Sequence, residues 1–181
     1  MSWTAPMTAV ANTAFTAAQW NTHGRDNLNV TAPGVATTAG GWIVSAGLNT
    51  VVQRTPMVHY VGTGGGTDQT SYVDLTSTGA TLTVTTGPSA IVSFGAQMSN
   101  NVAGLGSRVA VDVTGASTLE ASDLNSFYAE SGNANDAFKG TWTTIFSPLV
   151  PGVNVFTLKY RTTTGGGTSQ FSSRVLTVIS F

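Results

Sequence analysis

The sequence predicts a mainly β protein, an antiparallel jelly-roll β-sandwich that follows an N-terminal arm and a short α-helix. Three observations lead to this prediction. Short segments after residue 55 alternate apolar and polar side chains with a period of two, as half-buried antiparallel strands do. Turns that contain glycine or proline separate these segments. One stretch alone, residues 15–28, carries the start signals of a helix.

Charge is scarce along the chain, which excludes several function classes. Charged residues make up 8% of the 181 residues, against about 25% in average soluble proteins. The seven lysines and arginines stand singly, so we expect no nucleic acid partner. No apolar run of 18 residues occurs, so no membrane insertion is expected, and the opening MSWTAPMTAV lacks the pattern of a signal peptide. The chain has no cysteine, which excludes disulfides and thiolate metal sites.

The helix signal follows an extended arm, residues 1–14. Thr16 is the predicted N-cap, and Gln19 stands three residues later, as a capping box requires. Phe15 and Trp20 occupy the two positions of a hydrophobic staple. The segment Thr31–Gly34 is a breaker that ends the helix.

This helix is expected to need support from outside itself. Gly24 costs about 1 kcal/mol relative to alanine, and three turns are marginal alone. A large aromatic side chain buries about 200 Å², and no local core is apparent for the tryptophans of the arm, helix and connector. We therefore predict that a partner or a sister subunit covers a set of assembly anchors, namely Trp3, Phe15, Trp20, Leu28 and Trp42.

The sequence divides into three predicted parts. Residues 1–30 are the arm and helix, residues 31–55 an irregular connector, and residues 56–181 the jelly-roll β-sandwich. The predicted strands of the sandwich are Met57–Gly62, Ser71–Thr76, Thr81–Thr86, Ala90–Met98, Arg108–Val113, Phe127–Glu130, Gly140–Phe146, Val155–Thr162 and Arg174–Ile179. The triple glycines at 64–66 and 165–167 are expected to be flexible loops, and Trp142 is expected in the core with Phe146.

Catalytic, metal and cofactor sites are not indicated. His23 and Asp26 lie three residues apart on the helix but lack a further metal ligand. His59 alternates with Val58 and Tyr60, so we expect it to face solvent or a neighbouring subunit. Neither glycine triplet continues as a phosphate-binding loop.

Parts of the sequence resemble minor tail and fibre-like virion surface proteins of tailed bacteriophages of actinobacteria. In those proteins a helix with the pattern Leu-Asn-Thr-His-x-Arg-Asp-Asn-Leu is followed by Thr-Ala-Pro and Thr-Thr-Ala-Gly. Here Trp20 and Gly24 replace aliphatic residues, so we expect the helix to pack differently. The resembling segments are Trp3–Pro6, Phe15–His23, Arg25–Leu28, Thr31–Pro33, Thr37–Gly40, Pro151–Arg161 and Phe171–Ile179.

The resemblance implies a jelly-roll head, usually trimeric, with no enzymatic activity. It favours a virion structural protein on the particle surface, attached by its N-terminal arm to other tail or capsid proteins. Capsid decoration or a head fibre is the alternative location.

Two further functions stay open at this level. The first is a carbohydrate- or receptor-binding module for a host-surface glycan, with loop aromatics Tyr72, Phe127 and Tyr128 as the candidate contacts. The second is a hydrolase with Asp123 and Glu130 as paired carboxylates.

Overall fold

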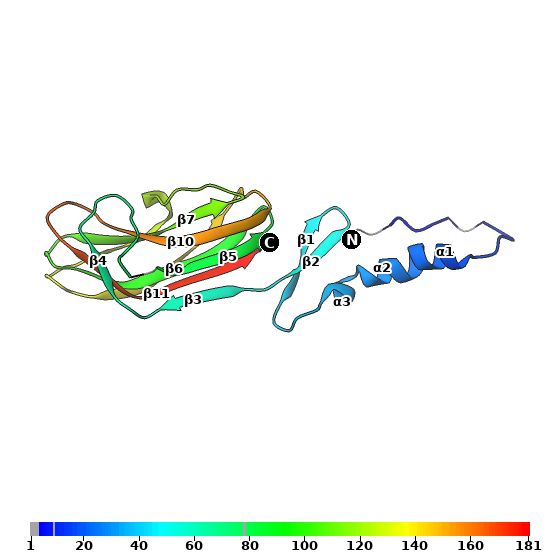
Figure 1. Cartoon of the computed structure of the whole chain (residues 1–181), viewed down its shortest axis with the longest axis horizontal. Coiled ribbons are helices and arrows are strands. Elements are labelled where there is room, and N and C mark those ends of the chain that lie inside the picture. The colour runs from blue at the N-terminus through cyan, green and yellow to red at the C-terminus, as the bar shows by residue number, and fades with distance from the viewer. Residues whose placement is uncertain (1–3, 9, 78) are drawn as a thin grey trace. The chain divides into compact units, whose positions relative to one another are not determined.

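The computed structural model of the chain describes residues 4–8, 10–77 and 79–181. The chain forms two compact units, one of Met1–Pro56 with Phe181 and one of Met57–Ser180 (Figure 1). The mainly β architecture with a short helical segment near the N-terminus confirms the predicted fold class.

The first unit contains the predicted helix. The segments α1 (Ala17–Trp20), η1 (Asn21–Arg25) and α2 (Asp26–Asn29) follow one another directly, and η1 is a π-helical turn. The helix ends at Asn29, close to the predicted stop, but the predicted breaker Thr31–Gly34 is itself largely helical. The chain then makes one more helical turn, α3 (Ala32–Val35), which the sequence pattern did not indicate.

The expectation of an irregular connector over residues 31–55 is wrong. Strands β1 (Trp42–Gly47) and β2 (Thr50–Arg54) pair as an antiparallel hairpin, with Trp42 opposite Arg54. Asn49 in the turn has φ 55°, the left-handed conformation that asparagine tolerates better than most residues. The turn lacks the Asn-Gly or Asp-Gly pair that marks a hairpin in sequence, which is why the hairpin escaped prediction.

The second unit is an antiparallel sandwich of two sheets. One sheet has the order β5 (Thr81–Thr86), β10 (Gly152–Thr162), β7 (Gly106–Gly115) and β8 (Ser126–Glu130). The other has the order β3 (Met57–Val61), β11 (Ser169–Ser180), β6 (Ala90–Asn100) and β9 (Phe138–Phe146), and β4 (Gly65–Thr67) also pairs with β11. We call these the β10 sheet and the β11 sheet.

The strand order is compatible with a jelly roll. The jelly-roll topology itself stays a prediction. Successive strands alternate largely between the two sheets, and β3, near the start of the sandwich, lies beside the final strand β11. This is the arrangement expected when two Greek keys are rolled together.

The core lies between the two sheets and is built by strict alternation. In β10 every second residue from Asn154 onward is buried, and β11 shows the same alternation on each side of an irregularity between Ser172 and Val175. The largest apolar side chains that this alternation buries fully are Tyr160, Phe94, Phe156, Phe171, Met98, Leu158 and Leu176. Several uncharged polar residues follow the same alternation inward, and Asn154 and Thr162 of β10 and Ser169 and Ser180 of β11 are buried.

Three local predictions are wrong. Ser71–Thr76 is not a strand, because only Val73 makes a bridge, to Tyr160. The first glycine triplet is not simply a loop, since Gly65 begins β4, where a Cβ would meet the Ser77 hydroxyl at 2.7 Å. Trp142 does pair with the core residue Phe94 but is 48% exposed on the edge strand β9.

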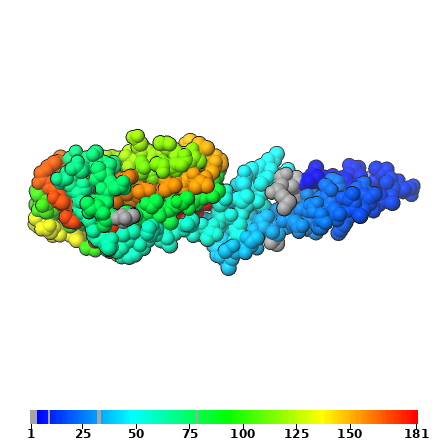
Figure 2. Space-filling model, viewed as in Figure 1, coloured from blue at the N-terminus to red at the C-terminus, as the bar shows by residue number. Residues whose placement is uncertain are grey.

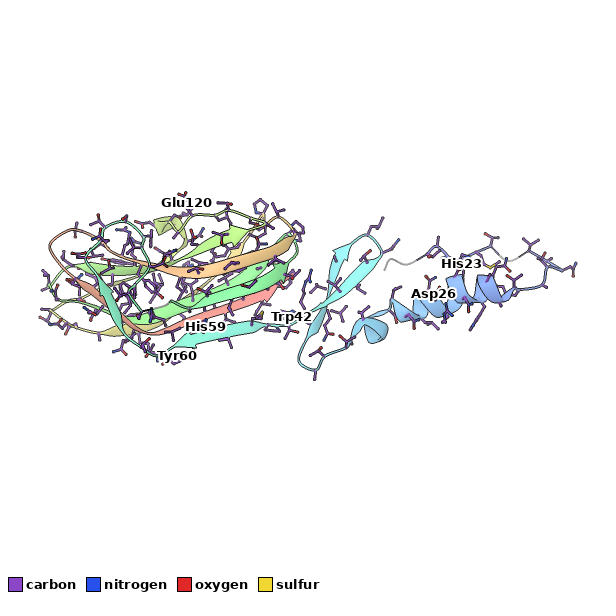
Figure 3. The ribbon with its side chains drawn as sticks, in the orientation of Figure 1. His23, Asp26, Trp42, His59, Tyr60 and Glu120 are labelled. Atoms are coloured by element: carbon purple, nitrogen blue, oxygen red, sulfur yellow. The ribbon has the colours of Figure 1, made fainter. Side chains whose placement is uncertain are left out.

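His59 does not face solvent or a neighbouring subunit. Its Nδ1 lies 2.9 Å from the Thr81 carbonyl oxygen, at the start of β5 (Figure 3). His59 is opposite the buried Leu176 in the β3–β11 pair, so it shares the inward side of the sheet. Val58 and Tyr60, its neighbours in sequence, are the residues that face outward and are exposed.

Candidate functional site

The N-terminal helix begins as the sequence predicted. The Thr16 hydroxyl accepts a hydrogen bond from the Gln19 amide, and the Gln19 side chain accepts one from the Thr16 amide, which together make a complete capping box. The rings of Phe15 and Trp20 meet edge to face with centroids 6.2 Å apart. The predicted staple is therefore confirmed, and it fixes the direction in which the arm enters the helix.

Asn27 and His23, one helical turn apart, hold the arm against the helix (Figure 1). The Asn27 side chain accepts a hydrogen bond from the Thr4 amide and donates one to the Thr4 carbonyl, both at 2.9 Å. His23 Nδ1 lies 3.2 Å from the Ala5 carbonyl. Asn27 is almost fully buried, and the arm and helix lie against each other in Figure 2. The sequence alone assigned Asn27 no role.

The predicted anchors remain largely uncovered within the chain. Trp20 is 55% exposed and Leu28 is 62% exposed, while Phe15 and Trp42 are also classed as exposed. Trp3 lies outside the described residues. Four of the predicted anchors are therefore exposed large apolar side chains in the N-terminal unit. Together they provide apolar surface that a partner can bury.

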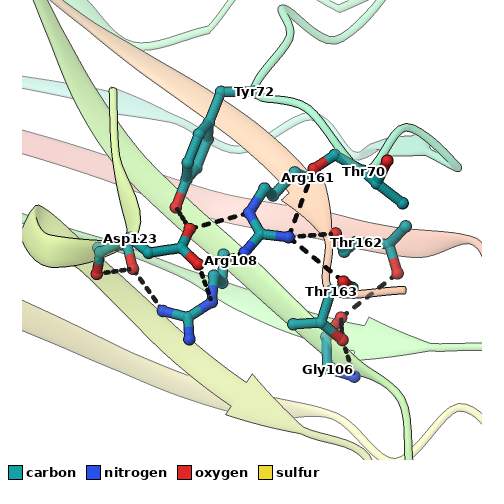
Figure 4. A network of polar contacts seen from close by, with 9 residues as sticks. Thr70, Tyr72, Gly106, Arg108, Asp123, Arg161, Thr162 and Thr163 are labelled. Atoms are coloured by element: carbon teal, nitrogen blue, oxygen red, sulfur yellow. Dashed lines mark hydrogen bonds and ion pairs between the residues drawn. The ribbon is translucent and has the colours of Figure 1, made fainter. Parts of the chain in front are cut away.

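The outward face of the β10 sheet carries a charged network centred on Asp123, in the short 3-10 turn η2 (Asp123–Asn125) (Figure 4). Arg108 and Arg161 are directly opposite each other in the β7–β10 pair. Arg161 Nε donates to Asp123 Oδ1 at 3.0 Å, a second Arg161 nitrogen pairs with Oδ2, and Arg108 Nε lies 3.6 Å from Oδ2. The Tyr72 hydroxyl donates to Oδ1 at 3.0 Å.

The electrostatics of this network follow from its geometry. Two arginines opposite each other would repel, and the Asp123 carboxylate between them offsets that repulsion. Hydrogen bonding from Arg161 lowers the pKa of the Asp123 carboxyl below its ordinary value. Burial raises the pKa of the Tyr72 hydroxyl. Asp123 therefore stays ionised and acts as a counter-ion, the opposite of the protonated acid that a glycosidase needs.

The three aromatics expected to face a ligand are engaged by the protein itself. The Arg161 guanidinium lies 5.4 Å from the Tyr72 ring centroid, and that of Arg108 lies 4.7 Å from the Tyr128 ring. The Tyr128 hydroxyl donates to Glu130 at 2.7 Å, which raises the pKa of the tyrosine. Phe127 packs on Phe138 with ring centroids 5.9 Å apart.

An open, mostly polar pocket lies beside this network. Ser71 and Tyr72 line it on one side, and Asp112, Glu120, Ala121 and Lys159 line the rest. Lys159 is held by Asp74 at 2.7 Å. Such a pocket offers a polyol hydrogen-bonding groups beside apolar surface of similar extent.

The described residues contain no cluster of three or more histidine, aspartate or glutamate side chains placed to hold a metal ion. His23 and Asp26 are not brought together as ligands, since Asp26 pairs with Arg25 at 2.8 Å. Within the same described residues, no helix is long and apolar enough to cross a membrane.

Comparison with known proteins finds only distant similarity in fold. No protein-family model matches the chain, and no curated protein matches it. Among solved structures, one similar to this chain is the structure of infectious bursal disease virus, Gx strain, at 14% identity and a TM-score of 0.40. The match covers 75% of this chain and 35% of the viral chain. The VP2 subviral particle of the same virus gives 14% identity and a TM-score of 0.40 over 75% and 36% of the two chains.

Dimeric latent PorU from Porphyromonas gingivalis is similar at 17% identity and a TM-score of 0.29, over 66% of this chain and 12% of that one. The chain spans about a third of the length of the viral chains that it matches. Similarity at this level assigns no function, so the functional argument rests on the chain's own residues.

Proposed function

We propose that this chain is a structural protein of a bacteriophage virion, attached to the particle through residues 1–30 and displaying its β-sandwich on the particle surface as a homotrimer. A minor tail or fibre-like protein is the leading location, and capsid decoration or a head fibre is the alternative. The proposal treats the chain as a non-enzymatic protein without cofactor, whose partners are tail or capsid proteins.

The observation that carries this proposal is the contrast between the order and the exposure of the N-terminal helix. The capping box and the Asn27 contacts fix the helix and its arm in one arrangement. The side chains of Phe15, Trp20 and Leu28 nevertheless remain exposed. A preorganised element that keeps apolar side chains in water loses little conformational freedom when a partner covers them.

Attachment is tested on particles of the phage whose genome encodes the chain. The double variant Trp20→Ser/Leu28→Ser removes apolar surface without touching the capping box or Asn27. We expect its copy number on gradient-purified particles to fall at least about tenfold, a loss of about 1.4 kcal/mol or more in binding. Leu124→Ser, in the sandwich unit and 89% exposed, is the matched control.

The outcomes separate cleanly. Equal incorporation of the double variant and the control would show that the helix is not the attachment element. Absence of the chain from purified wild-type particles would overturn the virion assignment itself. Gold-labelled antibody on intact particles decides between tail and capsid.

A second function, recognition of a host-surface glycan, is favoured by the polar pocket beside Tyr72. Its carboxylates and its lysine suit sugar hydroxyls better than an apolar ligand. A glycan array probed with the full chain tests this function, with Glu120→Gln as the variant expected to weaken a signal. A uniformly blank array would contradict it.

A further inference from the structure

The two outward faces of the sandwich differ sharply in charge. The β10 sheet holds five charged strand residues, and the segments over it add Asp74 and Asp123. The five are Arg108, Asp112, Glu130, Lys159 and Arg161. The corresponding face of the β11 sheet carries Lys139 at one margin and otherwise lacks charged side chains among the described residues.

The uncharged face is defined by three rows that run across paired strands. Each row lies on the outward side, because the residues between the rows are core residues such as Phe94, Leu176 and Val178. We call the following set the bare face. Its rows are Tyr60, Val175, Gly95 and Thr141; Val58, Thr177, Ser93 and Thr143; and Ile179, Ile91 and Ile145.

The bare face is open to solvent in the single chain. Val58 and Ile145, at its two edges, are each 65% exposed, and Tyr60 is also exposed (Figure 3). The residues of β11 and β6 between them are mostly half-buried, since neighbouring side chains crowd them. The three aligned isoleucines form an apolar row on this face. Its exposure to water is unfavourable in free energy.

We propose that the bare face is covered by a second copy of this chain. Charge is the first argument for that occupant. A face that packs around a symmetry axis on the same face of other copies must not carry a net charge, because the copies would repel. Charged side chains are also depleted at the centre of interfaces between identical subunits. Among the described strands of the sandwich, the outward charged side chains lie on the opposite sheet apart from Lys139.

Size is the second argument. Strands β11, β6 and β9 share about nine paired positions, and the shorter β3 extends the sheet by five residues. With about 4.8 Å between strands and about 3.4 Å per residue, the whole outward face of the β11 sheet measures about 500 Å², and the bare face makes up about two thirds of it. Two copies that cover this whole outward face would bury about 1,000 Å² together, the lower bound for a specific interface.

This inference rests on the proposed function for its setting, a multimeric display on a particle, but its test uses the free full-length chain. If the chain is absent from particles, the proposed function fails, but self-association of the free chain can still be measured. If the free chain is monomeric, this inference fails, but attachment to particles can still be measured. The test compares wild type with the double variant Val58→Lys/Ile145→Lys. Both positions are exposed edge residues, so a lysine can extend into water without entering the core.

The matched control is Val153→Lys, an exposed valine on the outward face of the β10 sheet. Mass is measured by sedimentation equilibrium at chain concentrations from about 1 to about 100 μM. Dissociation constants across this hundredfold range differ by about 2.7 kcal/mol in association free energy. We expect wild type and Val153→Lys to form the same oligomer. The double lysine variant is expected to raise the dissociation constant at least about tenfold.

Circular dichroism shows whether each variant keeps the sandwich. A wild-type chain that stays monomeric at the highest concentration overturns the proposal. So does a folded double lysine variant that associates as tightly as wild type. A double variant that unfolds is replaced by Thr141→Lys, which places the same charge at an exposed position of the same face.

Discussion

Arg174 is a fully buried guanidinium that joins two separate segments of the sandwich. Its nitrogens donate to the Thr63 carbonyl at 2.9 Å and to the Ser77 carbonyl at 3.2 Å, and its Cζ lies 5.6 Å from the Tyr160 ring centroid. A bulge in β11 between Ser172 and Val175, with Ser173 at φ 47°, accompanies this inward placement.

Replacement of Arg174 by methionine is expected to lower the free energy of unfolding by about 2–4 kcal/mol, because two inward carbonyl groups lose their donor. Urea denaturation followed by tryptophan fluorescence measures the change. Lys139→Met, an exposed position of β9, is the control. A loss no larger than that of the control would mean that water satisfies both carbonyls.

Asn27→Ala is expected to release the arm from the helix, since both hydrogen bonds to Thr4 are lost. Hydrogen exchange at the Thr4 amide should accelerate at least about fivefold, which corresponds to about 1 kcal/mol of lost protection. Asn29→Ala, an exposed neighbour, is the control. Unchanged exchange in the Asn27 variant would assign the arm to another contact.

Asp123 makes stability depend on acid. Its pKa is lower in the folded chain than in the unfolded chain, so the unfolded chain takes up the proton first as pH falls. The stabilisation is therefore fully present above the unfolded value of about 3.9 and is lost as pH falls through the folded value.

Asp123→Asn should remove the Asp123 part of that acid dependence and lower stability at neutral pH, because Arg108 and Arg161 then face each other without a counter-ion. Thermal unfolding at a series of pH values between about 7 and about 3 measures both effects. Glu120→Gln is the control carboxylate. The same slope in wild type and Asp123→Asn would exclude this role for the network.

None of these contacts could be predicted from the sequence. Asn27 binds a residue 23 positions earlier, and Arg174 binds carbonyls 97 and 111 positions away. In a chain so rich in serine, threonine and asparagine, the sequence gives no sign of which polar side chains turn inward. Local signals such as Thr16 and Gln19 were predictable because capping acts within one helical turn.

At the scale of elements, Trp20 and Gly24 form a pair on the helix. A Cβ at Gly24 would lie 3.1 Å from a carbon of the Trp20 ring, closer than ordinary contact. The glycine that weakens the helix thereby makes room for the indole. The large Trp20 and the small Gly24 are therefore explained together.

This coupling is testable with a double-mutant cycle. Gly24→Ala alone should gain less than the helix-propensity value of about 1 kcal/mol, because the methyl group displaces the Trp20 ring from Phe15. The same change in a Trp20→Leu background should gain nearly the full value. Helix content and urea denaturation of the four proteins measure the coupling, and equal gains in both backgrounds would refute it.

Strands were predictable where one face is buried and the other is polar. Thr81–Thr86 alternates leucine and valine with threonine, and its predicted and observed bounds agree. The β1–β2 hairpin was missed because its residues are only partly buried and show no such alternation. Strand β4 was missed because glycines carry no pattern. Ser71–Thr76 was predicted wrongly because it does alternate, with Leu75 in the core, but only Val73 pairs with another strand.

At the scale of the molecule, the scarcity of charge is not uniform. The net charge of −1 hides a sandwich with a charged network on one sheet and the bare face on the other. Since a sandwich needs only its inner faces to fold, folding alone does not require this separation. Two sheets that differ in outward chemistry suit two environments, one aqueous and one occupied by protein.

This separation leads to a prediction about salt. Raising NaCl from about 0.1 M to about 1 M shortens the Debye length from about 10 Å to about 3 Å, so association through charged surfaces weakens steeply. Association through the bare face has no charges to screen, so its dissociation constant should change by less than about threefold over that range. Sulfate should strengthen it, because excluded salts favour burial of apolar surface. Sedimentation equilibrium in both salts measures the effect. Dissociation by NaCl would instead assign the contact to the charged face of the β10 sheet, where Arg108, Asp123 and Arg161 are the groups that screening weakens.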